Sequence, residues 1–129
     1  MKSFLVKGRV FSGKSEAARF TELPWVKRQI TEELGFTPYS GTLNVKLTED
    51  CLKLRSLLKR VKVIEITPAT SFCRGRCFKA YLMDAECAIV IPEIANYPSD
   101  VIEVIAPMNL REKFQLQDGD TVEIKISLG

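Results

Sequence analysis

The sequence contains no histidine among its 129 residues, and this absence excludes several classes of chemistry. Without an imidazole there is no Cys–His nucleophile, no histidine acid–base pair and no histidine ligand for a metal. Any reaction that the chain catalyses must use carboxylates, hydroxyls, amides, lysine, arginine, backbone groups or a metal held by oxygen atoms.

Cysteine is scarce, and its spacing argues against a zinc site. The four cysteines, Cys51, Cys73, Cys77 and Cys87, include no C-x-x-C pair of the kind found in zinc ribbons and knuckles. We expect ordinary structural thiols instead. Because Cys73 and Cys77 flank Arg-Gly-Arg, this segment predicts a β-hairpin with Gly75 at its tip.

Long hydrophobic runs are also absent, since none approaches the roughly 18 residues that a membrane-spanning helix needs. Lys7 and Arg9 interrupt the first apolar stretch, where a signal peptide would be continuous. These features predict a cytoplasmic protein. Nineteen basic and 16 acidic residues give a formal net charge of +3, which tolerates phosphate ligands but is weak for nucleic-acid binding.

Short runs rich in Val, Ile and Phe dominate what the sequence does contain, and we predict strands at 3–12, 42–47, 61–67, 77–82, 86–91, 100–105 and 121–127. Many short strands with few helices favour a mainly β fold, a compact barrel with a few short helices. No linker or repeat interrupts the chain, so a single domain is predicted over residues 1–129.

Helical spacing is limited to short segments. Val26, Ile30 and Leu34 recur at i, i+4 and i+8 between Pro24 and Gly35, which suit a first turn and a C-cap. A second helix is predicted after Thr48, with its apolar face on Cys51, Leu54 and Leu58. A third covers 108–114, and a turn at Asp118-Gly119 follows it.

The segment Gly8-Arg-Val-Phe-Ser-Gly13-Lys14-Ser15 matches the P-loop pattern G-x-x-x-x-G-K-[ST] letter for letter. Its context does not match, because only seven residues precede Gly8 and Arg-Val-Phe has strand character. Pro24 also limits any helix that follows. We therefore predict that this chain does not have a P-loop fold, although these residues can still meet phosphates in another architecture.

Residues 42–47 place polar side chains on one face of a predicted strand. Leu43, Val45 and Leu47 would face the core, while Thr42 and Asn44 present a hydroxyl and an amide oxygen side by side. Neutral oxygen ligands suit Mg²⁺ when phosphates supply the negative charge. The alternative is an ordinary half-exposed strand.

Two further segments are candidates. Glu103 shares a strand face with Val101 and Ile105, so its carboxylate lies in an apolar setting unless it is an edge-strand residue that reaches solvent. Met108 to Phe114 opens a short helix whose free amides would suit an anion. The alternative there is a surface turn with Leu110 and Phe114 in the core.

Taken together, these stretches resemble the archaeal-type CTP-dependent riboflavin kinases over nearly the whole chain. The matching motifs, specific in their order and separation, are Gly8 to Gly13, Leu34 to Leu47 with its Gly-Thr-Leu-Asn block, Ala88-Ile-Val-Ile-Pro92, Val101-Ile-Glu-Val-Ile-Ala-Pro107, Asn109-Leu-Arg111 and Asp118-Gly-Asp120.

The resemblance implies a six-stranded cradle-loop, Greek-key-like barrel that phosphorylates the 5′-hydroxyl of riboflavin with CTP and gives FMN and CDP. Position by position, it makes Thr42 and Asn44 ligands of Mg²⁺. Glu103 aligns with a residue that contacts the flavin, by binding the ribityl chain or by orienting the attacking hydroxyl. The remaining residues would contact nucleotide: Gly13, Lys14, Ser15, Glu16, Ala17, Ala18, Met108, Asn109, Leu110 and Arg111. No nucleic acid, membrane or obligatory protein partner is implied.

Two departures from the family pattern keep an alternative open. The loop Gly13–Ala18 is poor in glycine, and Ala95 stands where a flavin-contacting Thr is common, so that contact is lost or passes to Asn96. A non-catalytic barrel that binds nucleotide or flavin is therefore the second hypothesis. A third is a basic barrel for single-stranded nucleic acid, but most aromatic residues lie in apolar runs rather than beside Lys and Arg.

Overall fold

The computed structural model describes residues 3–12, 21–39, 41–48, 64–66, 75–92 and 97–127. In these residues the strands are β1 (Ser3–Phe11), β2 (Leu43–Leu47), β3 (Ile64–Ile66), β4 (Gly75–Leu82), β5 (Ala85–Pro92), β6 (Val101–Ile105) and β7 (Thr121–Ser127). The helices are α2 (Pro24–Leu34) and α4 (Leu110–Phe114). Each strand overlaps a predicted run. The helix predicted after Thr48 lies outside the described residues.

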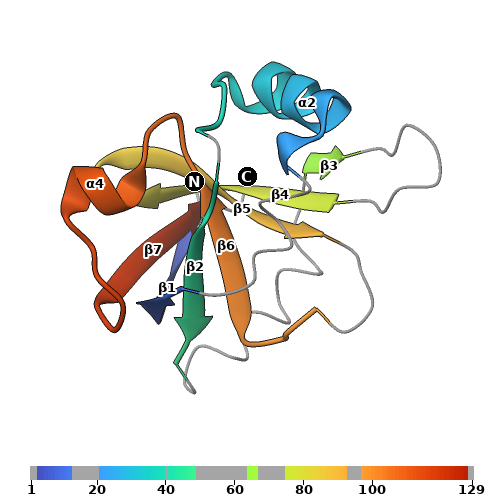
Figure 1. The fold of residues 1–129 in the computed structure, drawn as a ribbon. Helices are drawn as coiled ribbons and strands as arrows, with labels where there is room; N and C mark the ends of the chain where they lie inside the picture. The colour runs from blue at the N-terminus through green and yellow to red at the C-terminus, as the bar shows by residue number, and fades with distance from the viewer. Residues whose placement is uncertain are drawn as a thin grey trace.

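The strands form one antiparallel sheet that closes on itself. Their order is β3-β4-β5-β6-β2-β1-β7, and β7 also pairs with β4, where Ala80 lies opposite Ile126. Six strands, from β4 through β5, β6, β2 and β1 to β7, therefore make a closed barrel, and β3 extends the sheet beyond β4 (Figure 1). The predicted six-stranded barrel is confirmed.

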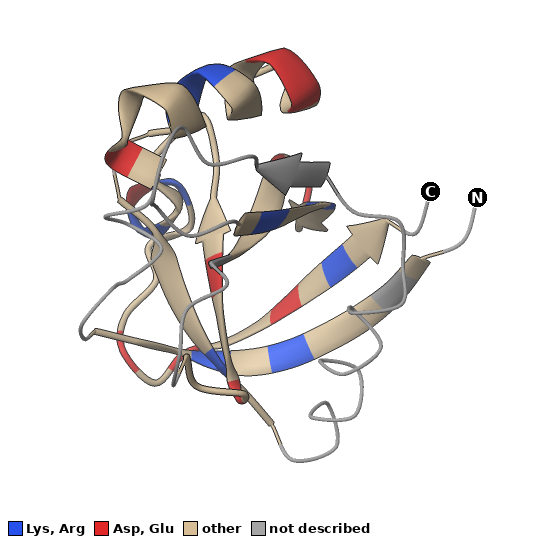
Figure 2. Cartoon of the chain, turned by 90° about the vertical axis from the view of Figure 1, so that its right-hand side faces the viewer, with Lys and Arg blue, Asp and Glu red and all other residues tan. Residues whose placement is uncertain are grey.

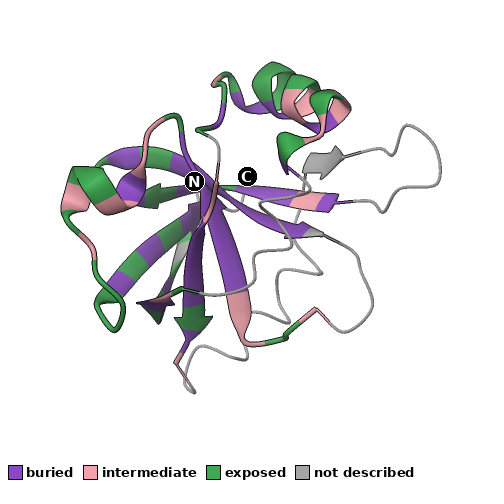
Figure 3. Cartoon of the chain, in the orientation of Figure 1, coloured by how far each residue is buried: buried purple, intermediate pink, exposed green. Residues whose placement is uncertain are grey.

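Alternating residues fill the barrel interior. In β7, Val122, Ile124 and Ile126 are buried, while the residues between them are exposed. Closing the sheet gives every barrel strand one face on the same interior, whereas the outer face is exposed in β7 but largely buried in β6 (Figure 3). The outer faces of β1 and β7 carry charges of both signs, including the Lys7–Glu123 pair at 3.4 Å (Figure 2).

A second apolar cluster lies outside the barrel, under α2. Val26, Ile30 and Leu34 are the buried residues of this helix, and they belong to one cluster with side chains from β4, β5 and β6: Cys77, Ala88, Val90 and Ile105. Gly35 ends the helix at φ 80°, with its N–H donating to the carbonyl of Thr31, so the predicted helix and cap are confirmed. Strand β5 is consequently buried on both faces.

The hairpin predicted around Gly75 is wrong. Gly75 is the first residue of β4, where it lies opposite Ile66 of β3 and Pro92 of β5. The tight turn is instead at Met83-Asp84 between β4 and β5, and Met83 takes the left-handed conformation with φ 55°. The two cysteines that flank Arg-Gly-Arg therefore did not mark a hairpin turn, because Gly75 belongs to a strand.

Cys77 and Cys87 are free thiols in the interior of the fold. Cys77 belongs to the cluster under α2, and Cys87 belongs to the barrel interior. Burial raises the pKa of each thiol to about 12. Both residues are thus structural, as predicted, while Cys51 and Cys73 lie outside the described residues.

Gly8 is required by strand packing rather than by a phosphate loop. It lies inside β1, opposite Leu47 of β2 and Val122 of β7. A Cβ at this position would collide with the Val45 side chain and would lie 2.6 Å from the Lys46 carbonyl oxygen. The first half of the P-loop pattern is therefore a β-strand.

Neither helix in the described part of the chain has the length and apolarity to cross a bilayer.

Candidate functional site

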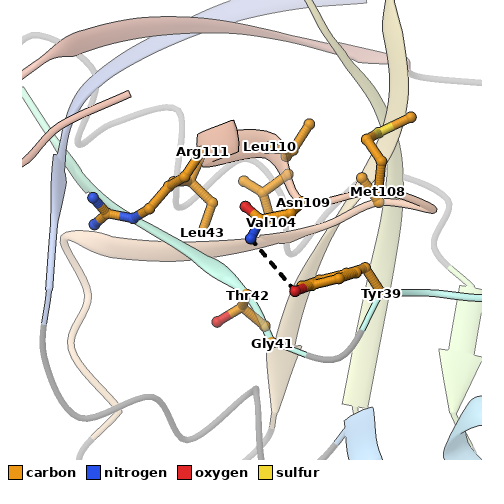
Figure 4. Close-up of a pocket in the computed structure, with 10 residues that line it drawn as sticks. Tyr39, Gly41, Thr42, Leu43, Val104, Met108, Asn109, Leu110 and Arg111 are labelled. Carbon is orange, nitrogen blue, oxygen red and sulfur yellow. Dashed lines mark hydrogen bonds between the residues drawn. The ribbon is translucent and has the colours of Figure 1, made fainter. Parts of the chain in front are cut away.

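One end of the barrel carries a cavity of about 270 Å³. Because β2 and β6 are antiparallel, the start of β2 and the end of β6 lie at the same edge. The cavity is lined from there and from the start of α4, by Tyr39, Gly41, Thr42, Leu43, Val104, Ala106, Met108, Asn109, Leu110 and Arg111 (Figure 4). The structure thus brings Thr42 together with all four predicted residues of the 108–111 segment.

Asn109 fixes the wall of this cavity at the start of α4. Its side-chain oxygen accepts a hydrogen bond from the N–H of Glu112 at 3.3 Å, which makes it the N-cap of the helix. Its side-chain nitrogen donates to the Tyr39 hydroxyl at 3.5 Å across the cavity (Figure 4). The Tyr39 N–H donates to the carbonyl of Ala106 at 2.7 Å. These bonds hold the segment before β2 against the segment after β6.

Arg111 is anchored at the end of β1 by a single guanidinium nitrogen. Its Nη2 donates to the carbonyl of Phe11 at 3.1 Å, to Ser12 Oγ at 3.3 Å and to Asp118 Oδ1 at 2.8 Å. Within the described residues, the contacts of this guanidinium all use Nη2. Arg111 also lines the cavity, so the residue that the resemblance assigns to phosphate lies at this site.

Asp118 organises this exposed cluster. Ser12 Oγ donates to Asp118 Oδ1 at 2.9 Å, so one carboxylate oxygen receives hydrogen bonds from both Ser12 and Arg111. The hydrogen bond from Arg111, followed by that from Ser12, holds the pKa of Asp118 below its ordinary value. The carboxylate remains charged at neutral pH and keeps the guanidinium at the end of β1.

A second polar cluster, made of Thr42, Asn44, Glu103 and Tyr97, lies between β2 and β6. Asn44 is directly opposite Glu103 in the ladder, and Thr42 shares the Asn44 face of the chain. Glu103 is only 2% exposed. It accepts hydrogen bonds from Thr42 Oγ1 on Oε1 and from the Tyr97 hydroxyl on Oε2, both at 2.7 Å. Glu103 is therefore buried and bonded, and not an edge residue in solvent.

Asn44 is the polar residue of this cluster that fits a metal ligand. Only 7% of it is exposed, and within the described residues its side-chain amide makes no hydrogen bond. Buried amides usually have partners, and a bound ion is one partner that fits this position. The amide oxygen of Asn44 and the hydroxyl of Thr42 are hard oxygen donors, the type that Mg²⁺ prefers. The residues present therefore fit this ion.

Several residues of the site were not found by sequence reasoning. Tyr97 and Tyr39 lie in polar loops, and only their aromatic character beside Pro98 and Pro38 hints at a role. Ser12 and Asp118 meet although they are far apart in sequence. Among the predicted residues, Gly13, Lys14, Ser15, Glu16, Ala17 and Ala18 lie outside the described part of the chain, as do Ala95 and Asn96.

Comparison with known proteins gives a family match over most of the chain. The family model CTP-dep_RFKase, whose description reads Domain of unknown function DUF120, matches residues 10–126. A riboflavin kinase of Pyrobaculum aerophilum is 44% identical over 125 residues, which cover 94% of this chain and 60% of the relative. Riboflavin kinases of Methanosarcina barkeri and Archaeoglobus fulgidus are 37% and 39% identical, with 94% and 95% of this chain covered. The chain spans 56% and 54% of these two relatives.

Proposed function

Because the chain belongs to the CTP-dependent riboflavin kinase family, we propose that it transfers the γ-phosphate of CTP to the 5′-hydroxyl of riboflavin. A bond forms between the riboflavin oxygen and the γ-phosphorus, and the bond from that phosphorus to the β–γ bridging oxygen breaks. The products are FMN and CDP. The observation that carries the proposal is the barrel-end cavity, where Thr42 and Arg111 line the same space.

Arg111 is proposed to bind the phosphates of CTP. Its Nη2 is held by Phe11, Ser12 and Asp118, so the guanidinium is already oriented before the nucleotide arrives. A pre-oriented cation loses little side-chain freedom on binding, which favours the geometry that phosphoryl transfer needs. Met108, Asn109 and Leu110 would contribute the rest of this wall, and Asn109 is fixed there by its capping bond.

Thr42 and Asn44 are proposed to hold Mg²⁺. When bound, the ion would neutralise charge on the phosphate oxygens. Asn44 would offer the amide oxygen that finds no partner among the described residues, and Thr42 would offer its hydroxyl oxygen. No cluster of His, Cys, Asp and Glu within the described residues fits a metal by itself. Neutral ligands beside a triphosphate account for this composition.

Glu103 is proposed to contact riboflavin from the other side of the site. Its carboxylate is held by the Thr42 and Tyr97 hydroxyls, so it would present its oxygen atoms to a ribityl hydroxyl in a fixed orientation. Held at 2% exposure, it would orient the substrate in a site with little water.

A non-catalytic binding barrel is the second candidate, and the glycine-poor sequence Gly13-Lys-Ser-Glu-Ala-Ala18 favours it. A backbone that wraps phosphates closely often needs glycine. This alternative keeps the same cavity and the same ligands but has no turnover.

One assay separates these candidates. The protein is incubated with riboflavin, MgCl₂ and one of CTP, ATP, GTP or UTP, and flavins and nucleotides are separated by chromatography. We expect FMN and CDP in equal amounts with CTP, and much less FMN with the other three. A reaction with EDTA serves as the control. Binding of CTP and riboflavin without FMN formation would reject the kinase and support the binding barrel.

A further inference from the structure

Tyr39 brings an aromatic ring to the barrel-end cavity, and among the described residues of the lining it is the one that does so. The residue is 48% exposed, so the interior of the fold does not enclose its ring. Figure 4 shows Tyr39 reaching from the segment before β2 toward Asn109, whereas the Arg111 guanidinium points away from Tyr39. We propose that the Tyr39 ring stacks on the pyrimidine base of the nucleotide, with the phosphates on the Arg111 side.

The two sides of the cavity differ in chemistry. Arg111 is the charged residue among the described residues of the lining, and it belongs to the cluster with Ser12 and Asp118. Tyr39 and Met108 lie on the other side in Figure 4, and Met108 packs against the barrel interior. A nucleotide has the same polarity, because its phosphates are charged and its base is a flat aromatic ring. A base on the Tyr39 side therefore suits both ends of the ligand.

Tyr39 is attached to the fold at its backbone and at the tip of its side chain. Its N–H donates to the carbonyl of Ala106 at 2.7 Å, and its hydroxyl accepts from Asn109 Nδ2 at 3.5 Å. Neither contact occupies a face of the ring. Tyrosine also has only two side-chain torsions, so a ring placed in this way loses little conformational entropy when a ligand stacks on it.

Riboflavin also carries a flat ring system, but the contacts of Tyr39 favour the nucleotide. The Tyr39 hydroxyl is bonded to Asn109, which belongs to the 108–111 wall proposed to contact CTP. Glu103, the proposed flavin contact, is not among the residues that line this cavity. The inference deepens the proposed function and rests on it for the identity of the ligand. It adds a contact to the base, where Arg111 accounts only for the phosphates.

Calorimetric titration without turnover tests the contact. CDP with MgCl₂ is one probe, and pyrophosphate with MgCl₂ is a second probe that lacks the base. Tyr39→Leu removes the ring but keeps an apolar side chain, and Tyr39→Phe keeps the ring but removes the hydroxyl. Tyr81→Leu is the matched control, because Tyr81 is a 44% exposed tyrosine on β4 that does not line the cavity.

We expect Tyr39→Leu to weaken CDP binding about 10-fold, since a base stacked on an aromatic side chain typically contributes at this level. Pyrophosphate binding should stay within about twofold of wild type, as should CDP binding by Tyr39→Phe and Tyr81→Leu. Equal losses for CDP and pyrophosphate in Tyr39→Leu would overturn the inference, because Tyr39 would then act on the phosphate site. Unchanged CDP binding in Tyr39→Leu would also overturn it.

Nuclear Overhauser effects in the wild-type protein provide a second measurement that needs no variant. With CDP bound, the H5 and H6 protons of cytosine should show cross-peaks to the ring protons of Tyr39. This result decides the inference even where Tyr39→Leu fails to fold. Cross-peaks from Tyr39 to riboflavin in place of cytosine, bound CDP without such cross-peaks, or a wild-type protein that binds no CDP would overturn it. Cross-peaks to cytosine in a protein that forms no FMN would reject the kinase while supporting the stacking contact.

Discussion

Glu103 and Asp118 are two carboxylates that each hold one residue lining the cavity, and they differ in burial. Glu103 is 2% exposed and holds Thr42, whereas the Asp118 side chain is 56% exposed and holds Arg111. Among the described residues, the side-chain donors to Glu103 are the neutral hydroxyls of Thr42 and Tyr97, while those to Asp118 are a guanidinium and a hydroxyl. The site is therefore built from one buried and one exposed cluster.

This difference in burial suggests that the two clusters have different roles in the site. Buried hydrogen bonds in a region of low dielectric are expensive to break, so the Glu103 cluster is suited to hold a fixed arrangement. An exposed ion pair is weak and screened by salt, so Arg111 can exchange part of its contacts for a phosphate at little cost. We expect substitutions in the buried cluster to impair catalysis, and to lower stability where they break a hydrogen bond, whereas substitutions in the exposed cluster should affect mainly nucleotide affinity.

The largest effect is expected from Asn44→Leu. The substitution keeps the side-chain volume at a buried position but removes the amide oxygen, so kcat should fall roughly 100-fold or more. The thermal unfolding midpoint should be retained, because the amide makes no hydrogen bond within the described residues. Lys46→Leu, on the same strand face but exposed, is the control. Full activity in Asn44→Leu would reject the metal assignment.

Glu103→Gln should have the next largest effect. An amide keeps the shape but presents N–H groups to one of the two hydroxyls, so the free energy of unfolding should fall by about 1–3 kcal/mol. KM for riboflavin should rise about 10-fold and KM for CTP much less. Chemical denaturation and initial rates measure both quantities, with exposed Glu123→Gln as control. Equal damage to riboflavin and CTP use would indicate a structural role instead.

Arg111→Lys tests the exposed cluster. Lysine keeps the charge but loses the planar guanidinium, in which Nη2 bonds to Phe11, Ser12 and Asp118 and the other nitrogens would bond to phosphate. KM for CTP should rise about fivefold, with stability unchanged. Arg9→Lys, an exposed change on β1, should leave KM for CTP as in the wild type. A loss of stability comparable to that of Glu103→Gln would contradict the division between the clusters.

Asp118→Asn should give the smallest effect, and one that depends on pH. The pKa of Asp118 is lowered in the folded protein, so its contribution to stability is present above the unfolded pKa of about 3.9. It is lost as the pH falls through the lowered folded value. The wild-type protein should therefore melt slightly above Asp118→Asn at pH 7, with no difference in strong acid. A difference that grows toward acid would contradict the assignment.

Local patterns in the sequence predicted the barrel well. Strand β7 alternates without a break, and α2 has its apolar residues between Pro24 and Gly35, so the elements followed from periodicity. Gly75 misled because a glycine between polar residues is compatible with both a turn and a strand. Only the pairing with Ile66 and Pro92 decides between them, and such pairing is not a local property.

From residue spacing alone, the predictable part of the site was the pair of polar residues on a single strand face. Thr42 and Asn44 share a face by the two-residue period of a strand, but the burial of Asn44 depends on pairing with β6. Tyr97 and Asp118 meet their partners through the closed barrel, so no spacing in the sequence reveals them. The roles in binding metal, nucleotide and flavin stay predictions, to be decided by the variants above.

Cys77 and Cys87 offer a practical way to watch the barrel open. A thiol with a pKa of about 12 is almost wholly protonated at neutral pH and does not attack alkylating reagents. Modification at these positions, identified by peptide mass mapping, therefore reports how often the interior becomes accessible. Cys77 lies in the cluster under α2 and Cys87 lies in the barrel interior. Comparing their labelling rates would therefore show which of these two regions becomes accessible to the reagent more often.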